Sequence, residues 1–405
     1  MTTMTSTTKV SALAQKYEEK IRSLRRHIHR HPELSFNESG TAKLVAETMR
    51  KLGYEVQIKA GGLGVVADLG KPETSAGGKG KRIGLRADMD ALPITEDTSQ
   101  PYCSATEGVM HACGHDVHTA CTLGAAMILA ELHKAGELPG AVRFIFQPAE
   151  ESTNDDGKSG ATLMIEGGAI EDLDGVVGLH VFPDLPVGTI GLRAGSFLAA
   201  CDKFDIKING KGCHGAFPQN GIDAVVLASQ AVQTIQTIIS RRKSALSPCV
   251  LTLGGIRSTT YKSNIIADAV ELTGTARYFD PEISTQIKSE LTRALSVVES
   301  MGGTFELEYI TENPPLVNDP GLTEIVRKAA QQVPEVTQIV DPGQQMGAED
   351  FSFYCEAIPS CFIVLGAEIA GDRRSLHTPR FDVDEASLPL GAALLAQAAL
   401  TYLAH

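Results

Sequence analysis

The chain has 405 residues, and 43% of them are hydrophobic, a fraction typical of globular proteins. A chain of this length exceeds one ordinary hydrophobic core, so the length predicts more than one domain. Its 36 basic and 49 acidic side chains give a formal net charge of −13, which argues against nucleic acids and anionic membranes as partners.

The opening residues 1–8 are polar and rich in Thr and Ser, without the basic and apolar regions of a signal sequence. No later apolar run approaches the ~20 residues that span a bilayer. We therefore expect a cytoplasmic protein without a membrane partner. The eight cysteines include no Cys-x-x-Cys pair, so they predict reduced thiols rather than a disulfide framework or a zinc ribbon.

The N-terminal region predicts two helices. Apolar residues between positions 13 and 28 recur every three or four residues, and Pro32 disfavours helix in the residue before it. His27, His29 and His31 lie near this helix end, where histidines interact favourably with the helix dipole, so we interpret them as structural. The second helix is predicted over residues 39–52, ending at Gly53.

Strands are predicted next, over residues 54–58, 63–69 and 82–88. The last of these leads into Asp88 and Asp90, and carboxylates at the C-terminal end of a strand are well placed for chemistry in an open α/β sheet. Two glycine-rich stretches nearby, residues 61–64 and 77–81, lack the spacing of a dinucleotide or phosphate loop. We interpret both stretches as turns.

The stretch from Met110 to His118 concentrates cysteine and histidine. Cys113 and His115 are separated only by Gly114, so both side chains can face one point. A helical pattern follows to about Lys134, which places the pair on a loop between a strand and a helix. An isolated Cys-x-His pair is more often a buried thiol beside a solvated imidazole, so a metal site requires further ligands.

Further candidate ligands follow other predicted strands. The strand over residues 141–147 leads into Glu150 and Glu151, whose charges repel each other unless a cation such as a metal lies nearby; the alternative is two solvated loop glutamates. His180 belongs to a predicted strand over residues 175–181, where a lone histidine is more often a core residue. His377 lies in a loop between the strand over residues 361–365 and the last helix, residues 385–403.

The residues between these candidate ligands predict a separate set of strands and helices. This set has four strands and two helices, which indicate two helices on one small sheet (strands 201–209, 249–256, 269–278 and 304–310; helices 222–240 and 281–300). Because candidate ligands lie on both sides, we interpret residues 193–310 as a domain inserted into a catalytic domain formed by residues 1–192 and 311–405.

These motifs resemble the M20 family of metallopeptidases and amidohydrolases, specifically the branch of aminoacylases, hippurate hydrolases and auxin-conjugate hydrolases. The resemblance covers nearly the whole chain (residues 25–34, 86–93, 110–118, 147–151, 178–180, 347–351 and 376–379). It implies a zinc-peptidase-like α/β catalytic domain, with a mixed sheet flanked by helices, and an inserted α+β lid or dimerisation domain. A homo-oligomer formed through the lid is therefore a further expectation.

The resemblance also implies roles for individual residues. The metal ligands, for two divalent ions, would be Cys113, His115, Glu151, His180 and His377. Glu150 would be the general base. In the inserted domain His214, Asn264 and Arg277 would bind substrate.

The sequence departs from other M20 branches at three places. Asp88-Met89-Asp90 replaces a His-x-Asp motif, Cys113 replaces a bridging aspartate, and Ala267 stands where many relatives have proline. We therefore assign Asp88 no ligand role.

The implied activity is metal-dependent hydrolysis of the amide bond of N-acyl amino acids, with Glu150 as general base. A carboxypeptidase or dipeptidase acting on short peptides at the same site is the alternative. A metal-free protein that only binds ligands is less favoured, because a lost site would not be expected to keep every ligand and the base. The thiolate favours zinc, while the glutamates and histidines also suit manganese, with cobalt and nickel as further candidates.

Overall fold

The computed structural model describes residues 6–72 and 80–405. Residues 77–79 of the second glycine-rich stretch and residues 1–5 of the polar opening lie outside this range. The chain forms two compact units. The first unit contains residues up to Gly195, Val317–Gly343 and Phe353–His405, and the second contains Ser196–Leu316 and Gln344–Ser352.

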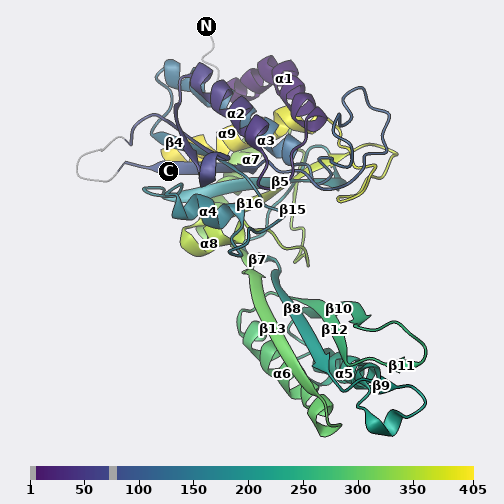
Figure 1. The fold of residues 1–405 in the computed structure, drawn as a ribbon. Helices are drawn as coiled ribbons and strands as arrows, with labels where there is room; N and C mark the ends of the chain where they lie inside the picture. Colours follow the sequence, from purple (N-terminus) through teal and green to yellow (C-terminus); the bar gives the residue numbers. More distant parts are fainter. Residues whose placement is uncertain (1–5, 73–79) are drawn as a thin grey trace. The chain divides into compact units, whose positions relative to one another are not determined.

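The first unit is built on an eight-stranded sheet with the order β1-β2-β4-β3-β5-β16-β6-β15. Figure 1 labels β4, β5, β15 and β16 of this sheet. The strands are β1 (Glu55–Lys59), β2 (Gly64–Leu69), β3 (Arg82–Asp88), β4 (Ala141–Gln147), β5 (Gly175–Pro186), β6 (Thr189–Gly191), β15 (Gln338–Val340) and β16 (Ser360–Glu368). The central strands β4, β3, β5 and β16 run parallel, whereas β2 is antiparallel to β4. The C-terminal ends of the parallel strands therefore meet at one edge of the sheet, and predicted site residues follow β3 and β4, while His180 lies within β5.

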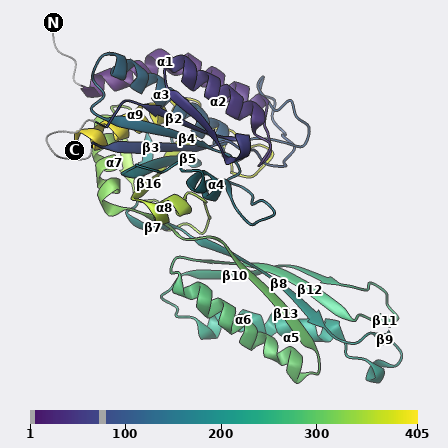
Figure 2. The ribbon, with the colours of Figure 1, turned by 60° about the vertical axis from the view of Figure 1, so that its left-hand side comes forward.

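Helices pack against this sheet in one continuous hydrophobic core. They are α1 (Ser6–Arg30), α2 (Ser39–Leu52), α3 (His115–Lys134), α7 (Pro320–Gln332) and α9 (Ser387–Ala404). Figure 2 shows α1, α2, α3 and α9 on one side of the sheet. Two shorter helices, α4 (Gly160–Glu166) and α8 (Ser352–Ala357), and a 3-10 turn at Ala60–Gly62 complete the set.

Among the described residues, α9 alone is long and apolar enough to cross a membrane, and 78% of its apolar window is buried inside the protein. Its residues belong to the core shared with α1 and α3. The apolar character of α9 is therefore explained by its packing in this core.

The second unit has a four-stranded antiparallel sheet in the order β10-β12-β8-β13. Its elements are β8 (Ala200–Asn209), α5 (Ala224–Thr237), a π-helical turn (Ile238–Arg242), β10 (Cys249–Ser258), β12 (Ala269–Tyr278), α6 (Glu282–Ser300) and β13 (Thr304–Asn313). Two short ladders pair β9 (Cys213–His214) with β11 (Ile265–Ile266), and β7 (Gly195–Leu198) with β14 (Leu316–Asn318). Helices α5 and α6 share an apolar core with the four-stranded sheet, so the prediction of two helices on one small sheet is confirmed.

The boundaries of the second unit differ from the predicted insert, residues 193–310. Strand β13 keeps pairing with β8 as far as Asn313. The segment Gln344–Ser352 joins this unit because Ala199 N donates to Gln345 O at 3.1 Å and to Gly347 O at 3.0 Å. Such long-range pairing of an irregular segment leaves no periodic signal in the sequence.

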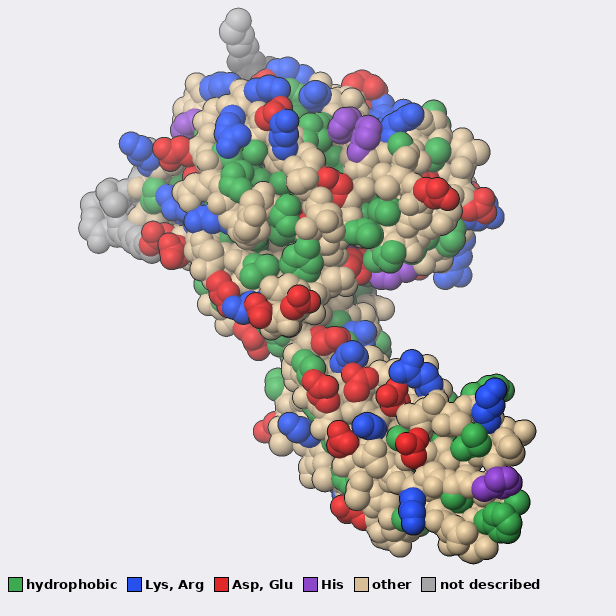
Figure 3. All heavy atoms as spheres, viewed as in Figure 1, with side chains coloured by type: hydrophobic (Ala, Val, Ile, Leu, Met, Phe, Trp, Pro, Cys, Tyr) green, Lys and Arg blue, Asp and Glu red, His purple; other side chains and the backbone are tan. Residues whose placement is uncertain are grey.

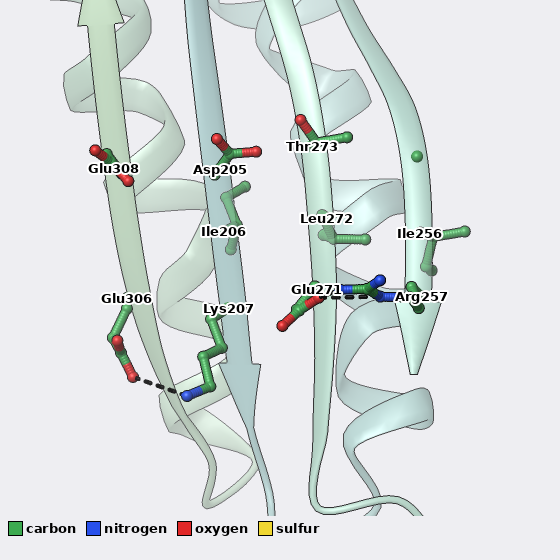
Figure 4. Close-up of a pocket in the computed structure, with 11 residues that line it drawn as sticks. Asp205, Ile206, Lys207, Ile256, Arg257, Glu271, Leu272, Thr273, Glu306 and Glu308 are labelled. Atoms are coloured by element: carbon green, nitrogen blue, oxygen red, sulfur yellow. Dashed lines mark hydrogen bonds and ion pairs between the residues drawn. The ribbon is translucent and has the colours of Figure 1, made fainter. Parts of the chain in front are cut away.

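The other face of the four-stranded sheet carries charged side chains in pairs. Figure 4 shows a hollow on this face and two ion pairs that line it. Arg257 Nη2 lies 2.5 Å from Glu271 Oε2, and Lys207 Nζ lies 4.0 Å from Glu306 Oε1. None of the predicted substrate-binding residues lines this hollow. The space-filling view likewise shows acidic and basic side chains interspersed on the visible face (Figure 3).

Candidate metal centre and active site

The turn before α3 places Cys113 and His115. Gly114 adopts a left-handed conformation with φ 93°, and a Cβ there would come within 2.3 Å of Val181 Cγ1. Only glycine fits both the backbone angle and this close approach. His115 begins α3, so the loop between strand and helix that the sequence predicts is present.

Cys113 lies at the centre of the candidate ligands. Its Sγ is 3.4 Å from His180 Nε2 and 3.2 Å from His377 Nε2. Two groups of metal-capable side chains share this thiol: Cys113 with His115 and His180, and Cys113 with Glu151 and His377; within each group the ligand atoms lie within 4.8 Å of one another. The five predicted ligands, distant in sequence, thus come together around one sulfur atom.

The remaining atoms of this cluster fit a bound cation. His115 Nε2 and Glu151 Oε1 are buried without a hydrogen-bond partner and lie 3.9 Å apart. Buried polar atoms are rarely left unpaired, and a bound cation would give both atoms a partner. The donor set of one thiol, histidines and a carboxylate is also one that binds zinc and related ions.

Hydrogen bonds at the far side of each imidazole fix the ring orientations. His115 Nδ1 lies 3.1 Å from Asp90 Oδ1, and His180 Nδ1 donates to the carbonyl oxygen of Val181 at 2.8 Å. Each ring therefore presents its Nε2 to the cluster, the arrangement found for metal-bound histidines, whose other nitrogen is usually hydrogen-bonded.

The electrostatics of the cluster are compatible with a bound cation. Burial, together with the charge of Glu151, raises the pKa of the Cys113 thiol well above its usual range. Burial and the neighbouring His118 hold the pKa of His180 well below its usual range, so that ring is neutral. A divalent cation would favour the thiolate and use the neutral imidazole as it stands.

The structure gives Asp88 a supporting position. Its Oδ1 accepts from His118 Nδ1 at 2.7 Å and its Oδ2 accepts from Arg86 Nη1 at 2.6 Å. The backbone N–H of Val181 donates to His118 Nε2 at 2.9 Å, which requires the tautomer with hydrogen on Nδ1. Both nitrogens of His118 are thereby occupied, so His118 and Asp88 brace α3 against β3 and β5.

The two adjacent glutamates share His115 as a neighbour but differ in their other contacts. Glu151 Oε1 lies 3.3 Å from His377 Nε2, and the Glu151 amide donates to Asp90 Oδ2 at 3.0 Å. Glu150 Oε2 lies 4.0 Å from His115 Nε2. Both carboxylates therefore approach His115 and form a third possible ligand group with it, but only Glu151 also belongs to the group around Cys113 and His377.

The predicted substrate-binding residues belong to the second unit. His214 of β9 is in register with Ile265 of β11, and Gly215 N donates to the carbonyl oxygen of Asn264 at 2.8 Å. His214 and Asn264 therefore lie side by side. Arg277 of β12 is in register with Cys201 of β8. The role of all three in substrate binding remains a prediction.

A buried ionic network supports the start of α3 from the opposite side. Asp116 accepts hydrogen bonds from Arg25 Nε and His29 Nδ1, both at 2.8 Å, and Arg25 Nη2 donates to Asp382 at 2.9 Å. Arg25 and Asp116 are completely buried. The prediction that His29 is structural is confirmed by these contacts.

We expect Asp116→Ala to lower the free energy of unfolding by about 3–5 kcal/mol, because it leaves the buried guanidinium of Arg25 without a main partner. Urea denaturation measures this loss. Glu166→Ala is the control, since its partner Lys158 lies at the surface at 2.8 Å, and this variant should keep the wild-type midpoint. A loss for Asp116→Ala of only about 0–1 kcal/mol, the size of a surface ion pair, would contradict the expectation.

The sequence points to Asp90 without its supporting role and does not point to Glu38. Asp90 contacts both His115 and Glu151, and the only signal for it was the Asp-x-Asp pattern at the end of a predicted strand. Glu38, which bonds the turn before Glu150, gave no signal because its partner is 111 residues away.

Comparison with known proteins connects this geometry to a family. Residues 84–401 match the model of peptidase family M20/M25/M40. An N-acetyl-L-cysteine deacetylase of Bacillus subtilis is 40% identical over 376 residues, covering 92% of this chain and 85% of that protein. Thermostable carboxypeptidase 1 of Saccharolobus solfataricus is 39% identical over 380 residues, covering 93% of each.

A solved structure shows the same architecture. The Bacillus subtilis YXEP protein, described as a dinuclear metal binding peptidase from the M20 family, superposes with a TM-score of 0.81 and 32% identity, covering 96% of this chain and 99% of that one. Family model, relatives and fold agree, and the resemblance inferred from the sequence motifs is confirmed. The chain belongs to the M20 family of metal-dependent hydrolases.

Proposed function

We propose that this protein is an aminoacylase-type amidohydrolase that cleaves N-acyl amino acids into a free amino acid and a carboxylate. The observation that carries the proposal is the pair of ligand groups sharing Cys113, with Glu150 beside them. The relative named as an N-acetyl-L-cysteine deacetylase supports an N-acyl amino acid as the substrate class.

Two divalent ions would be held in a binuclear centre by Cys113, His115, Glu151, His180 and His377. When bound, they supply the charge that makes a water molecule acidic and polarises the amide carbonyl. Zinc and manganese suit this mixture of thiolate, imidazole and carboxylate, and cobalt or nickel are alternatives.

The chain's own residues would carry the proton and hold the substrate. Glu150 takes a proton from the attacking water and returns it to the departing amine. His214 donates a hydrogen bond to the oxyanion that develops on the carbonyl. Asn264 and Arg277 hold the substrate, Arg277 through the planar fork that matches its carboxylate.

One screen tests the proposal. N-acetyl, N-benzoyl and long-chain acyl amino acids and dipeptides are incubated with the metal-free protein after addition of zinc, manganese, cobalt or nickel. We expect hydrolysis of N-acyl amino acids that depends on the added metal. Preferential cleavage of peptides would instead support the carboxypeptidase or dipeptidase alternative, which the relative named as a carboxypeptidase favours.

Metal analysis separates these enzymes from a protein that only binds ligands. A purified protein that takes up no divalent ion and cleaves none of the compounds would contradict the proposal.

We also propose a cytoplasmic location and an oligomer formed through the second unit, with neither nucleic acid nor membrane as partner. The eight cysteines all lie within the described residues and form no disulfide, which fits a reducing compartment. Light scattering during gel filtration tests the oligomer, and loss of assembly on removing residues of the second unit would locate its interface.

Arg277→Ala should weaken kcat/KM for N-acyl amino acids by about 10- to 100-fold, because a charge-assisted hydrogen bond to the substrate carboxylate is lost. The matching N-acyl amino amides, which lack that carboxylate, should be affected far less. Arg257→Ala is the matched control: Arg257 lies on the adjacent strand β10 and pairs with Glu271. Equal losses on both substrate types would make Arg277 a structural residue.

A further inference from the structure

The turn between β4 and α4 carries both glutamates of the candidate site and contains an unusual backbone conformation. Ala149, directly before Glu150, has φ 47°, in the left-handed region. This region costs a residue other than glycine about 1–2 kcal/mol, so other contacts must hold the turn. One contact is the hydrogen bond from Gly160 N to the Ala149 carbonyl oxygen at 2.8 Å.

Packing from α4 also restricts the turn. A Cβ at Gly160 would lie only 1.6 Å from the carbonyl oxygen of Pro148. The carbonyl oxygens of Pro148 and Ala149 therefore pack directly against Gly160 at the start of α4. This leaves the amide of Ala149 as the group that needs a partner from elsewhere.

That partner is Glu38, which is fully buried. Its Oε1 accepts a hydrogen bond from Ala149 N at 2.7 Å. Glu38 immediately precedes α2, where a carboxylate would ordinarily cap the helix, yet its side chain makes no cap hydrogen bond. The other carboxylate of this segment, Glu33, does so instead, accepting from Gly40 N at 2.9 Å and from Thr41 N at 2.8 Å.

Burying Glu38 is costly. Its Oε2 has no hydrogen-bond partner. Burial, with a smaller contribution from the charge of Asp90, raises the pKa of Glu38 to about 7. A buried carboxyl group with one unpaired oxygen destabilises a fold, and the Glu38 side chain does not offset this cost by capping α2.

A second contact holds the same turn from the same part of the chain. Asp90 Oδ2 accepts from Glu151 N at 3.0 Å and from Ser35 Oγ at 2.7 Å. The Ala149 amide is thus bonded to Glu38, and the Glu151 amide is bonded to Asp90, which in turn accepts a hydrogen bond from Ser35. The amides on both sides of Glu150 therefore depend on residues 35–38.

We propose that Glu38 is a positioning residue that fixes the peptide of Ala149 and thereby aims Glu150 and Glu151 at the metal centre. The proposal rests on the proposed function for the roles of those two glutamates. Glu38 itself touches neither the candidate ligands nor the substrate; it acts through one backbone hydrogen bond.

Two substitutions separate the reach of this side chain from its charge. Glu38→Gln keeps the length and an acceptor oxygen but removes the charge. Glu38→Asp keeps the charge but is one methylene shorter and cannot reach the Ala149 amide. A positioning role predicts that Gln preserves function and Asp does not, whereas a role for the charge predicts the reverse.

The experiment compares Glu38→Gln, Glu38→Asp and Glu38→Met with the control Glu33→Gln. For Asp and Met we expect kcat to fall by about 10- to 100-fold with little change in KM, and zinc affinity, measured by competition with a chelator, to fall by a similar factor. In the metal-free protein, hydrogen exchange at residues 149–151 should be faster in both. Glu38→Gln should resemble wild type in every measurement, and Glu33→Gln should lower only the unfolding midpoint.

The outcomes distinguish this proposal from the proposed function. The positioning role of Glu38 is overturned if Glu38→Asp is active and Glu38→Gln is inactive. It is also overturned if hydrogen exchange at residues 149–151 of Glu38→Asp equals that of wild type. Faster exchange without loss of kcat or zinc affinity also overturns it. If wild type cleaves no amide, the proposed function fails, and zinc affinity and exchange still decide whether Glu38 positions the turn. If Glu38→Met does not fold, Glu38→Asp and Glu38→Gln alone test whether Glu38 positions the turn.

Discussion

Glu150→Gln should retain its metal and its affinity for substrate while turnover falls by at least the ~10²- to 10⁴-fold typical of losing a general base. Glutamine has the size of glutamate but cannot take a proton from water. Glu151→Gln should instead lose affinity for at least one ion, and excess metal should restore part of its activity. The difference is expected because Glu151 lies 3.3 Å from His377 and belongs to the ligand group around Cys113, whereas Glu150 does not belong to that group.

Metal titration and steady-state kinetics on the two variants check this assignment. If Glu150→Gln is metal-poor and Glu151→Gln is metal-replete but inactive, the two roles are reversed. If both variants stay active, the pair does not carry the chemistry.

Cys113→Ser should have the broadest effect on metal binding, because the thiol is common to both ligand groups. A serine hydroxyl is a much poorer ligand than a thiolate for these ions. We expect metal affinity to fall by more than the ~10- to 100-fold that losing an outer hydrogen-bond partner costs, with a parallel loss of activity. The fold should persist, since α3 and the sheet do not depend on this sulfur.

Metal content after dialysis, activity and far-ultraviolet circular dichroism measure the three expectations. Cys103→Ser is the control, because Cys103 is a free thiol outside the cluster. Full metal content and normal turnover in Cys113→Ser would remove Cys113 from the site.

Local signals predicted most of the fold. Helix α2 has the predicted bounds, and Gly53 ends it in the left-handed conformation typical of a helix C-terminus. Strands β3 and β4 likewise have the predicted bounds. Helix α7 was missed, although Asp319 before Pro320 is a helix start signal and its side chain accepts from Leu322 N at 2.7 Å.

The site was only partly predictable. Residues such as Glu150 follow a strand and carry reactive groups, so their chain position already marks them. Supporting contacts depend on tertiary structure: Asp88 is occupied by Arg86 and His118, which only the folded sheet and helix reveal. The bond between Glu38 and Ala149 joins segments with no periodic or compositional link.

The burial of α9 also constrains how this protein is made. Helix α9 fills the core between α1, α3 and the sheet, and His377 comes just before it in the chain. During synthesis, the segment from α1 to α3 is made before α9. The apolar surface that α9 covers therefore stays exposed while the whole of the second unit is translated. The second unit has its own core and can fold in that interval. The core of the first unit is complete only after α9 has been translated, and His377, which contacts Cys113, is translated shortly before it.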